Sequence, residues 1–134
     1  MPDCEPTLDI NMGKEIDELK QLGIKIAVIT NSSLIWREDV RNDLCKADWV
    51  SLKVDTVSEK IWRKVDRPHG KLRLDEIIEG MRVFSKNFKG ELVAETMLIH
   101  GVNDGYGEME NVTSFISELN AKKSYILILT RPPA

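Results

Sequence analysis

The sequence is poor in the residues that mark secreted, metal-binding and membrane proteins. Its 134 residues include only two cysteines, Cys4 and Cys45, and two histidines. Two cysteines at this spacing form neither a disulfide framework nor a metal-binding knuckle. No apolar run approaches the roughly 20 residues that span a bilayer, and the N-terminus lacks the basic and then apolar pattern of a signal peptide. We therefore expect a cytoplasmic protein without a membrane segment.

The sequence also lacks an excess of positive charge. It holds 19 basic and 22 acidic side chains, which give a formal net charge of -3. An acidic chain without a basic stripe argues against a general nucleic-acid-binding surface. The apolar fraction of 42% and the charged fraction of 31% are typical of a globular protein. We expect one domain over residues 1–134.

Helical and strand-like segments alternate along the chain. Apolar residues at helical spacing alternate with short β-branched runs in which polar residues are few. Such alternation predicts an α/β fold with a parallel sheet of about four strands and right-handed crossovers. The predicted helices cover 13–22, 36–45, 57–65, 74–88 and 109–119, and the predicted strands cover 24–30, 47–55, 91–99 and 124–130.

The same spacing predicts the buried side of each helix. Ile16, Leu19 and Leu22 fall on one face of the helix over 13–22 and are expected to point inward. The helix over 74–88 is the longest, and its apolar stripe predicts the centre of the core. The stripe consists of Leu74, Ile77, Ile78, Met81, Phe84 and Phe88.

Polar residues gather where the predicted strands end. Ligands bind at the carboxyl ends of parallel strands, because loops and helix N-termini meet there. Four consecutive strand ends carrying polar groups therefore favour a ligand site. These groups are Thr30–Ser33 after the first strand, Ser51, Lys53 and Asp55 on one face of the second, Glu95 and His100–Asp104 at the third, and Thr130–Arg131 at the fourth.

Each of these segments also has a purely structural explanation. Thr30–Ser33 could cap the next helix, and Lys53 could form an ion pair with Asp55. Gly101–Asp104 could be only a turn, because glycine, asparagine and aspartate favour turns. His69 and His100 lack a partner at metal-ligand spacing, and a structural role is expected for both.

Six short segments carry polar or turn-forming residues in a particular order along the chain. They are EPTL (5–8), VITNSSL (28–34), ADWVSLKVD (47–55), RPH (67–69), GVND (101–104) and TRPPA (130–134). In this order they resemble the radical S-adenosylmethionine (radical SAM) superfamily, and the likeness is greatest to iron–sulfur oxidoreductases related to tRNA wyosine-synthesis enzymes and to pyruvate formate-lyase activating enzymes. The resemblance implies a partial (βα) barrel with helices on the outer face, which lacks the first two strands of the family barrel.

The resemblance also implies which residues contact the cofactor. The family binds the amino group of S-adenosylmethionine with a Gly-Glu-Pro-type motif, although Cys4 stands here where the family has glycine. The remaining implied contacts lie at the ends of the next three strands, toward the sugar, carboxylate and adenine of the cofactor. The implied set is Glu5, Pro6 and Thr7 in the motif, then Asn31, Ser32, Ser51, Lys53, Asp55, Gly101 and Asn103.

The family's chemistry needs a [4Fe–4S] cluster, which a CxxxCxxC loop holds. Cys4 and Cys45 cannot replace three clustered thiolates, so no metal ligand and no catalytic residue is assigned. The resemblance therefore implies the C-terminal portion of a radical SAM core. Such a portion is expected not to carry out the reductive cleavage of S-adenosylmethionine alone. A non-enzymatic half-barrel that binds ligands or serves as a scaffold, or one part of a split protein, is the alternative.

The first and last predicted strands form the two edges of the sheet. Both are apolar, and unpaired apolar edge strands favour pairing with another chain. The sequence therefore predicts self-association or a partner chain that binds through these edges.

Overall fold

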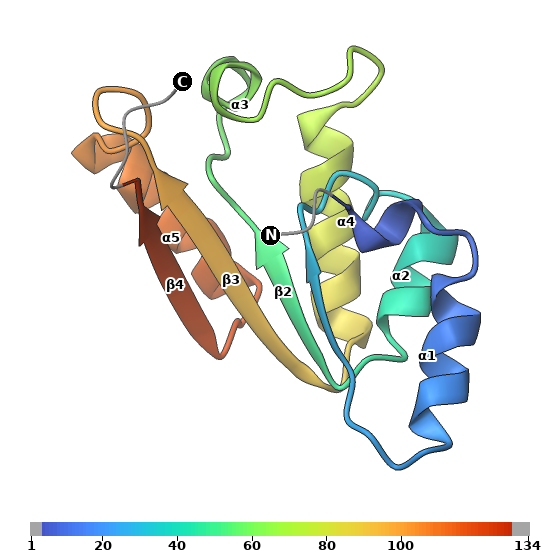
Figure 1. Cartoon of the computed structure of the whole chain (residues 1–134). Coiled ribbons are helices and arrows are strands. Elements are labelled where there is room, and N and C mark those ends of the chain that lie inside the picture. The colour runs from blue at the N-terminus through green and yellow to red at the C-terminus, as the bar shows by residue number, and fades with distance from the viewer. Residues whose placement is uncertain (1–3, 130–134) are drawn as a thin grey trace.

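The computed structural model describes residues 4–129, and this part of the chain folds around one four-stranded parallel sheet (Figure 1). The strand order follows the chain, and each strand pairs in parallel with the next. The prediction of an α/β fold with four parallel strands is confirmed. The strands are β1 (Ala27–Thr30), β2 (Trp49–Lys53), β3 (Glu91–Leu98) and β4 (Lys123–Ile128).

Helices lie between the strands in the chain, and two of them cover one face of the sheet. In Figure 1, α4 and α5 lie behind the strands, α1 and α2 lie beside β1, and α3 stands above the carboxyl end of β2. The opposite face, which we call the open face, has no helix against it within residues 4–129. The helices are the 3-10 turn η1 (Pro6–Leu8), α1 (Met12–Lys20), α2 (Glu38–Leu44), α3 (Glu59–Val65), α4 (Leu74–Asn87) and α5 (Tyr106–Glu118).

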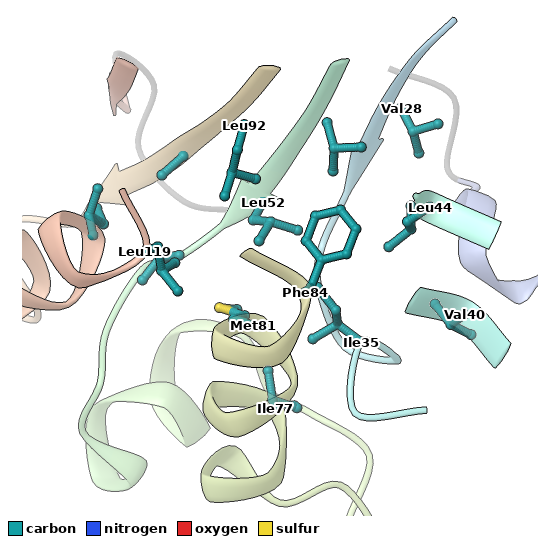
Figure 2. Close-up of a cluster of buried hydrophobic side chains, with 14 of the residues drawn as sticks. Val28, Ile35, Val40, Leu44, Leu52, Ile77, Met81, Phe84, Leu92 and Leu119 are labelled. Atoms are coloured by element: carbon teal, nitrogen blue, oxygen red, sulfur yellow. The ribbon is translucent and has the colours of Figure 1, made fainter. Parts of the chain in front are cut away.

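The hydrophobic core lies between the sheet and the helices, with α4 at its centre. Alternate side chains of the strands, among them Leu52 and Leu92, point toward the apolar stripe of α4 (Figure 2). Phe84 is completely buried at the centre of this cluster and stacks on Phe88 with 4.8 Å between the ring centroids. Burying one such aromatic side chain contributes about 1.5–3 kcal/mol. The predicted stripe of the long helix is therefore the main contact between helix and sheet.

The expectation that Leu19 and Leu22 point inward is wrong. Their exposed fractions are 44% and 71%, whereas Ile16 is buried. Helix α1 packs against α2, with its buried residues in the first half of the helix, and it ends at Lys20. The helical spacing is right, but the second half of α1 makes exposed ion pairs, from Asp17 to Lys46 and from Lys20 to Asp48, rather than apolar contacts.

Helix α4 makes an unusually close contact with the chain that follows β1. A Cβ atom added at Gly80 would lie 2.5 Å from the carbonyl oxygen of Ile35, which is closer than two such atoms can approach. Only glycine lets the α4 backbone pack directly on this segment. The contact fixes residues 33–36 against the helix, immediately after the polar end of β1.

Among residues 4–129, no helix is long and apolar enough to cross a membrane.

Candidate functional site

Most of the predicted site residues meet at the carboxyl edge of the sheet. Here β1 and β2 end, η1 lies against the end of β1, and α3 stands above the end of β2 (Figure 1). We use the term carboxyl edge for Glu5, Thr30–Ser32, Lys53 and Asp55, together with Asp66 at the end of α3. Hydrogen bonds and ion pairs connect these residues, as the following contacts show.

Glu5 joins η1 to the end of β1. It is the N-cap of η1, which begins at Pro6, a residue whose fixed φ suits a first helical position. Its Oε1 accepts hydrogen bonds from the amide and hydroxyl of Thr7, at 3.2 and 2.6 Å, and from the hydroxyl of Thr30 at 2.5 Å. Its Oε2 accepts one hydrogen bond, from the amide of Asn31 at 2.7 Å. A carboxylate oxygen has two lone pairs, so Oε2 can still accept a second donor.

Ser32 links the end of β1 to β2. Its φ of 68° lies in the left-handed region, which is uncommon for a residue with a side chain. Its amide donates to the hydroxyl of Thr30 at 3.1 Å, and its own hydroxyl accepts from the amide of Lys53 at 3.0 Å. Because Ser32 is buried and bonded on both sides, it fixes the spacing between the two strand ends.

The structure rules out the hypothesis that Thr30–Ser33 caps the next helix. The N-cap of α2 is Arg37, and no side chain caps that end. Four residues of turn separate Ser32 from Arg37. The amide oxygen of Asn31 accepts instead from the amide of Ser33 at 2.9 Å, within the turn itself. These polar side chains therefore serve the carboxyl edge rather than α2.

Lys53 forms the ion pair with Asp55 that the sequence suggested, and a second one that it did not. Its Nζ lies 2.9 Å from Oδ2 of Asp55 and 2.8 Å from Oδ1 of Asp66. Asp66 is the C-cap of α3 and directly precedes the Arg67–His69 segment. Sequence reasoning missed Asp66. The only local signal for it was an acidic residue next to that motif.

The buried carboxyl of Asp55 has an unusual pKa. Burial and, to a smaller extent, the nearby Asp66 together raise this pKa to about 6, against the opposing effects of the Met97 amide and the charge of Lys53. The Met97 amide donates to Oδ1 at 2.8 Å. Burial lowers the pKa of Lys53, but the hydrogen bond to Asp66 and the charge of Asp55 outweigh it, and the net pKa is raised. Lys53 is therefore an ammonium at neutral pH, when Asp55 is mostly ionised.

Two buried oxygen atoms at β2 lack a hydrogen bond within residues 4–129. They are Oγ of Ser51 and Oδ2 of Asp55. The ammonium of Lys53 is close enough to Asp55 to pair by charge, but it does not meet the angle of a hydrogen bond. Ser51 lies on the open face, between Ile29 and Val93 of the neighbouring strands. Unsatisfied buried polar atoms are rare, and a functional role or a bound water or ion is among the explanations for them.

The predicted adenine-side residues form a tight turn after β3. Gly101 has a φ of 74°, and its amide donates to Oδ1 of Asp104 at 2.9 Å. Asn103 is buried: its Oδ1 accepts from Ile99 at 2.7 Å, and its Nδ2 donates to the carbonyl oxygens of Asp55 and Met97, at 3.0 and 2.8 Å. Asn103 therefore braces the turn against β2 and β3. Thr130 and Arg131, predicted at the fourth strand end, lie outside the described residues.

A cavity of about 300 Å³ adjoins the carboxyl edge. It lies between α3, the segment 66–72 and α4. Asn31, Lys53 and Asp55 line its polar side, and Trp62 and Met81 are part of its apolar side. This volume is at the lower end of the range for small-molecule sites.

The donor set of the described residues does not fit an iron–sulfur cluster. Within residues 4–129, no group of three or more histidine, cysteine, aspartate or glutamate side chains could hold a metal ion. Cys4 is exposed and Cys45 is half-buried, on a different part of the chain. Burial raises the pKa of the Cys45 thiol, which disfavours the thiolate that binds metals.

The described residues form a parallel α/β fold with charged groups at the carboxyl edge of its sheet, and comparison with known proteins identifies the family. Residues 3–113 match the family model of the Radical SAM superfamily. The chain belongs to this superfamily, as the order of its motifs predicted.

Two relatives are similar over almost the whole chain. The chain is 52% identical over 132 residues to the UPF0026 protein MJ1312 of Methanocaldococcus jannaschii, and this match covers 98% of the chain and 41% of that protein. It is 32% identical over 130 residues to a UPF0026 protein of Helicobacter pylori, and this match covers 96% of the chain and 42% of that protein. The chain thus spans about two fifths of the length of these relatives.

A solved structure shares the fold. It is a domain of pyruvate-formate lyase-activating enzyme from Bacteroides vulgatus, with a TM-score of 0.71 and 18% sequence identity. The match covers 98% of this chain and 81% of that domain. The partial barrel expected from the motifs is consistent with this fold.

Proposed function

We propose that this chain supplies S-adenosylmethionine-binding residues of a radical SAM enzyme. The observation that carries the proposal is that opposite charges lie at the carboxyl edge. Glu5 caps η1 and bonds to the end of β1, and Lys53 ends the neighbouring strand β2. The amino-acid part of S-adenosylmethionine carries an ammonium and a carboxylate. A carboxylate with a spare acceptor site and an ammonium with a spare donor match these two groups.

Each side chain has a definite task in this arrangement. Glu5 accepts the ligand's ammonium through Oε2, while Thr7 and Thr30 hold its other oxygen, and Pro6 shapes the turn. Lys53 donates to the ligand's carboxylate. Asn31 and the unpaired hydroxyl of Ser51 provide further polar contacts along β1 and β2.

The remaining predicted residues support the site indirectly. Ser32 and Asp55 fix the position of Lys53, and Asn103 braces the turn at Gly101, where we place the adenine. The chemistry that the family draws from bound S-adenosylmethionine is reductive cleavage of a C–S bond. In this proposal, the described residues of this chain bind and orient S-adenosylmethionine.

The test is calorimetric titration of the chain with S-adenosylmethionine. Glu5→Gln and Lys53→Met should each weaken binding about 10- to 100-fold, because each removes one charge-assisted hydrogen bond. The matched controls are Glu110→Gln and Lys89→Met, which change exposed side chains away from the edge and should leave binding unchanged. Thermal denaturation confirms that each variant is folded.

The outcome decides between the two hypotheses from the sequence. A folded chain that does not bind S-adenosylmethionine contradicts the proposal and favours a non-enzymatic half-barrel. Binding that is equally weakened by the control variants would place the ligand elsewhere on the surface.

A further inference from the structure

Asp66 is a charged residue of the carboxyl edge to which neither the motifs nor the family resemblance gives a role. It follows α3 directly, and its amide donates to the carbonyl oxygen of Trp62, which closes the helix. Its Oδ1 lies 2.8 Å from Nζ of Lys53, and its side chain is about four-fifths buried. Asp66 therefore brings α3, which stands above the sheet, into contact with a residue of β2.

Lys53 is held from two independent elements. Asp55 belongs to the segment that follows β2, and the amide of Met97 fixes its carboxylate from β3. Asp66 belongs to α3 and approaches Lys53 from a different part of the chain, 13 residues along the sequence. A lysine side chain has four rotatable bonds, and holding it costs conformational entropy that one contact rarely offsets. Two carboxylates on separate elements fix the ammonium more strictly than one.

An ammonium has three N–H donors. Lys53 donates one of them to Asp66, whereas Asp55 pairs with the ammonium by charge alone. We propose that Asp66 is a positioning residue that acts through Lys53, so that a free N–H is held ready for the carboxylate of bound S-adenosylmethionine. The inference rests on the proposed function and adds to it a specific role for α3. The end of this helix then determines how well the edge recognises the amino-acid part of its ligand.

The negative charge of Asp66 also has an effect that weakens the binding of a carboxylate. Together Lys53, Asp55 and Asp66 carry a net negative charge when both carboxyls are ionised, and this charge repels an anionic ligand. Asp66→Asn separates the two effects, because it removes the charge but keeps an oxygen that can accept from Lys53. Asp66→Ala removes both the charge and the acceptor.

The experiment compares two ligands that differ in the group Lys53 is proposed to bind. S-adenosylmethionine has the amino-acid part, whereas 5′-methylthioadenosine lacks it. Asp66→Ala should weaken S-adenosylmethionine binding about 3- to 10-fold, which corresponds to loss of one oriented contact, and should leave 5′-methylthioadenosine within twofold. Asp66→Asn should restore most of the loss. Asp75→Ala, which removes an exposed carboxylate paired with Arg73, is the matched control.

A double mutant shows whether Asp66 acts through Lys53. In a Lys53→Met background, Asp66→Ala should cause no further loss of S-adenosylmethionine binding. Three outcomes overturn this inference alone, provided that the wild-type chain binds S-adenosylmethionine. In the first, Asp66→Ala weakens the binding of both ligands equally. In the other two, Asp66→Ala leaves binding unchanged, or the losses of the two single variants add in the double mutant. A wild-type chain that does not bind S-adenosylmethionine overturns the proposed function and this inference with it.

Discussion

The two faces of the sheet use the same strands for different purposes. On the face that the helices cover, Val28 and Leu52 are 7% and 0% exposed. On the open face, Ile29 and Leu127 are 46% and 51% exposed, and Ser51 and Lys53 carry polar groups toward the carboxyl edge. Successive strand residues point to opposite faces, so the apolar core residues of β1 and β2 and the polar groups of Ser51 and Lys53 fall on different faces. Substitutions on the two faces should therefore have different consequences.

The largest expected effect is on the covered face. Phe84→Ala should lower the free energy of unfolding by about 3–5 kcal/mol, because it leaves a cavity in a closely packed core. The same truncation on the open face, Ile29→Ala, should cost far less, since Ile29 is half exposed. Urea denaturation of both variants measures the contrast. Similar losses would mean that the open face is also packed in solution.

The second effect is the pH dependence of stability that the buried carboxyl of Asp55 causes. The pKa of Asp55 is raised from 3.8 to about 6, so the folded chain binds its proton more tightly than the unfolded chain does. The free energy of unfolding should therefore fall as pH rises from about 4 to about 6, by about 3 kcal/mol.

Asp55→Asn should remove this pH dependence, because the amide does not titrate and still accepts from Met97. Urea denaturation between pH 4.5 and 7.5 measures the slope. Asp104→Asn is the control, because it changes an acidic side chain that contacts His100 outside the carboxyl edge and should retain the slope. A wild-type chain whose stability rises with pH over this range contradicts the burial of the Asp55 charge.

The smallest effect on stability is expected for substitutions on the open face of β4. These substitutions should instead change the association of the chain with a second copy. The sequence predicted that apolar edge strands favour pairing, and we propose that β1 and β4 with the open face associate with a second copy. Leu127→Lys should change the free energy of unfolding by less than about 0.5 kcal/mol and shift the chain toward monomer. Light scattering at micromolar concentration measures the mass, and a monomeric wild type contradicts the proposal.

The sequence predicted the elements because their signals are local. Apolar spacing located all four strands and the five α-helices of the described chain, including the stripe around Phe84 that forms the core. It failed for Leu19 and Leu22, because spacing defines a helix face but not how far a neighbouring element extends along it. It also began the last helix at Met109, whereas α5 begins at Tyr106, since the first turn of a helix need not be apolar.

Most residues of the carboxyl edge were predicted, but the contacts between them were not. The sequence placed Asn31 and Lys53 at strand ends, the family resemblance added Glu5, and the structure brings these residues to one edge. The hydrogen bonds between Glu5 and the end of β1 join residues about 25 positions apart, and their pairing depends on how the elements pack. Asp66 lay hidden for the same reason, because an acidic residue at a helix end usually remains in solvent.

The close approach at Gly80 limits how this protein can diverge. Replacing glycine by alanine within a helix normally raises stability by up to about 1 kcal/mol. In α4 the added methyl group would strike the carbonyl of Ile35 and displace the segment that continues from Asn31 and Ser32. Position 80 therefore cannot accept alanine unless residues 33–36 change as well. Across related chains, these two segments should vary together, as a pair that selection preserves jointly.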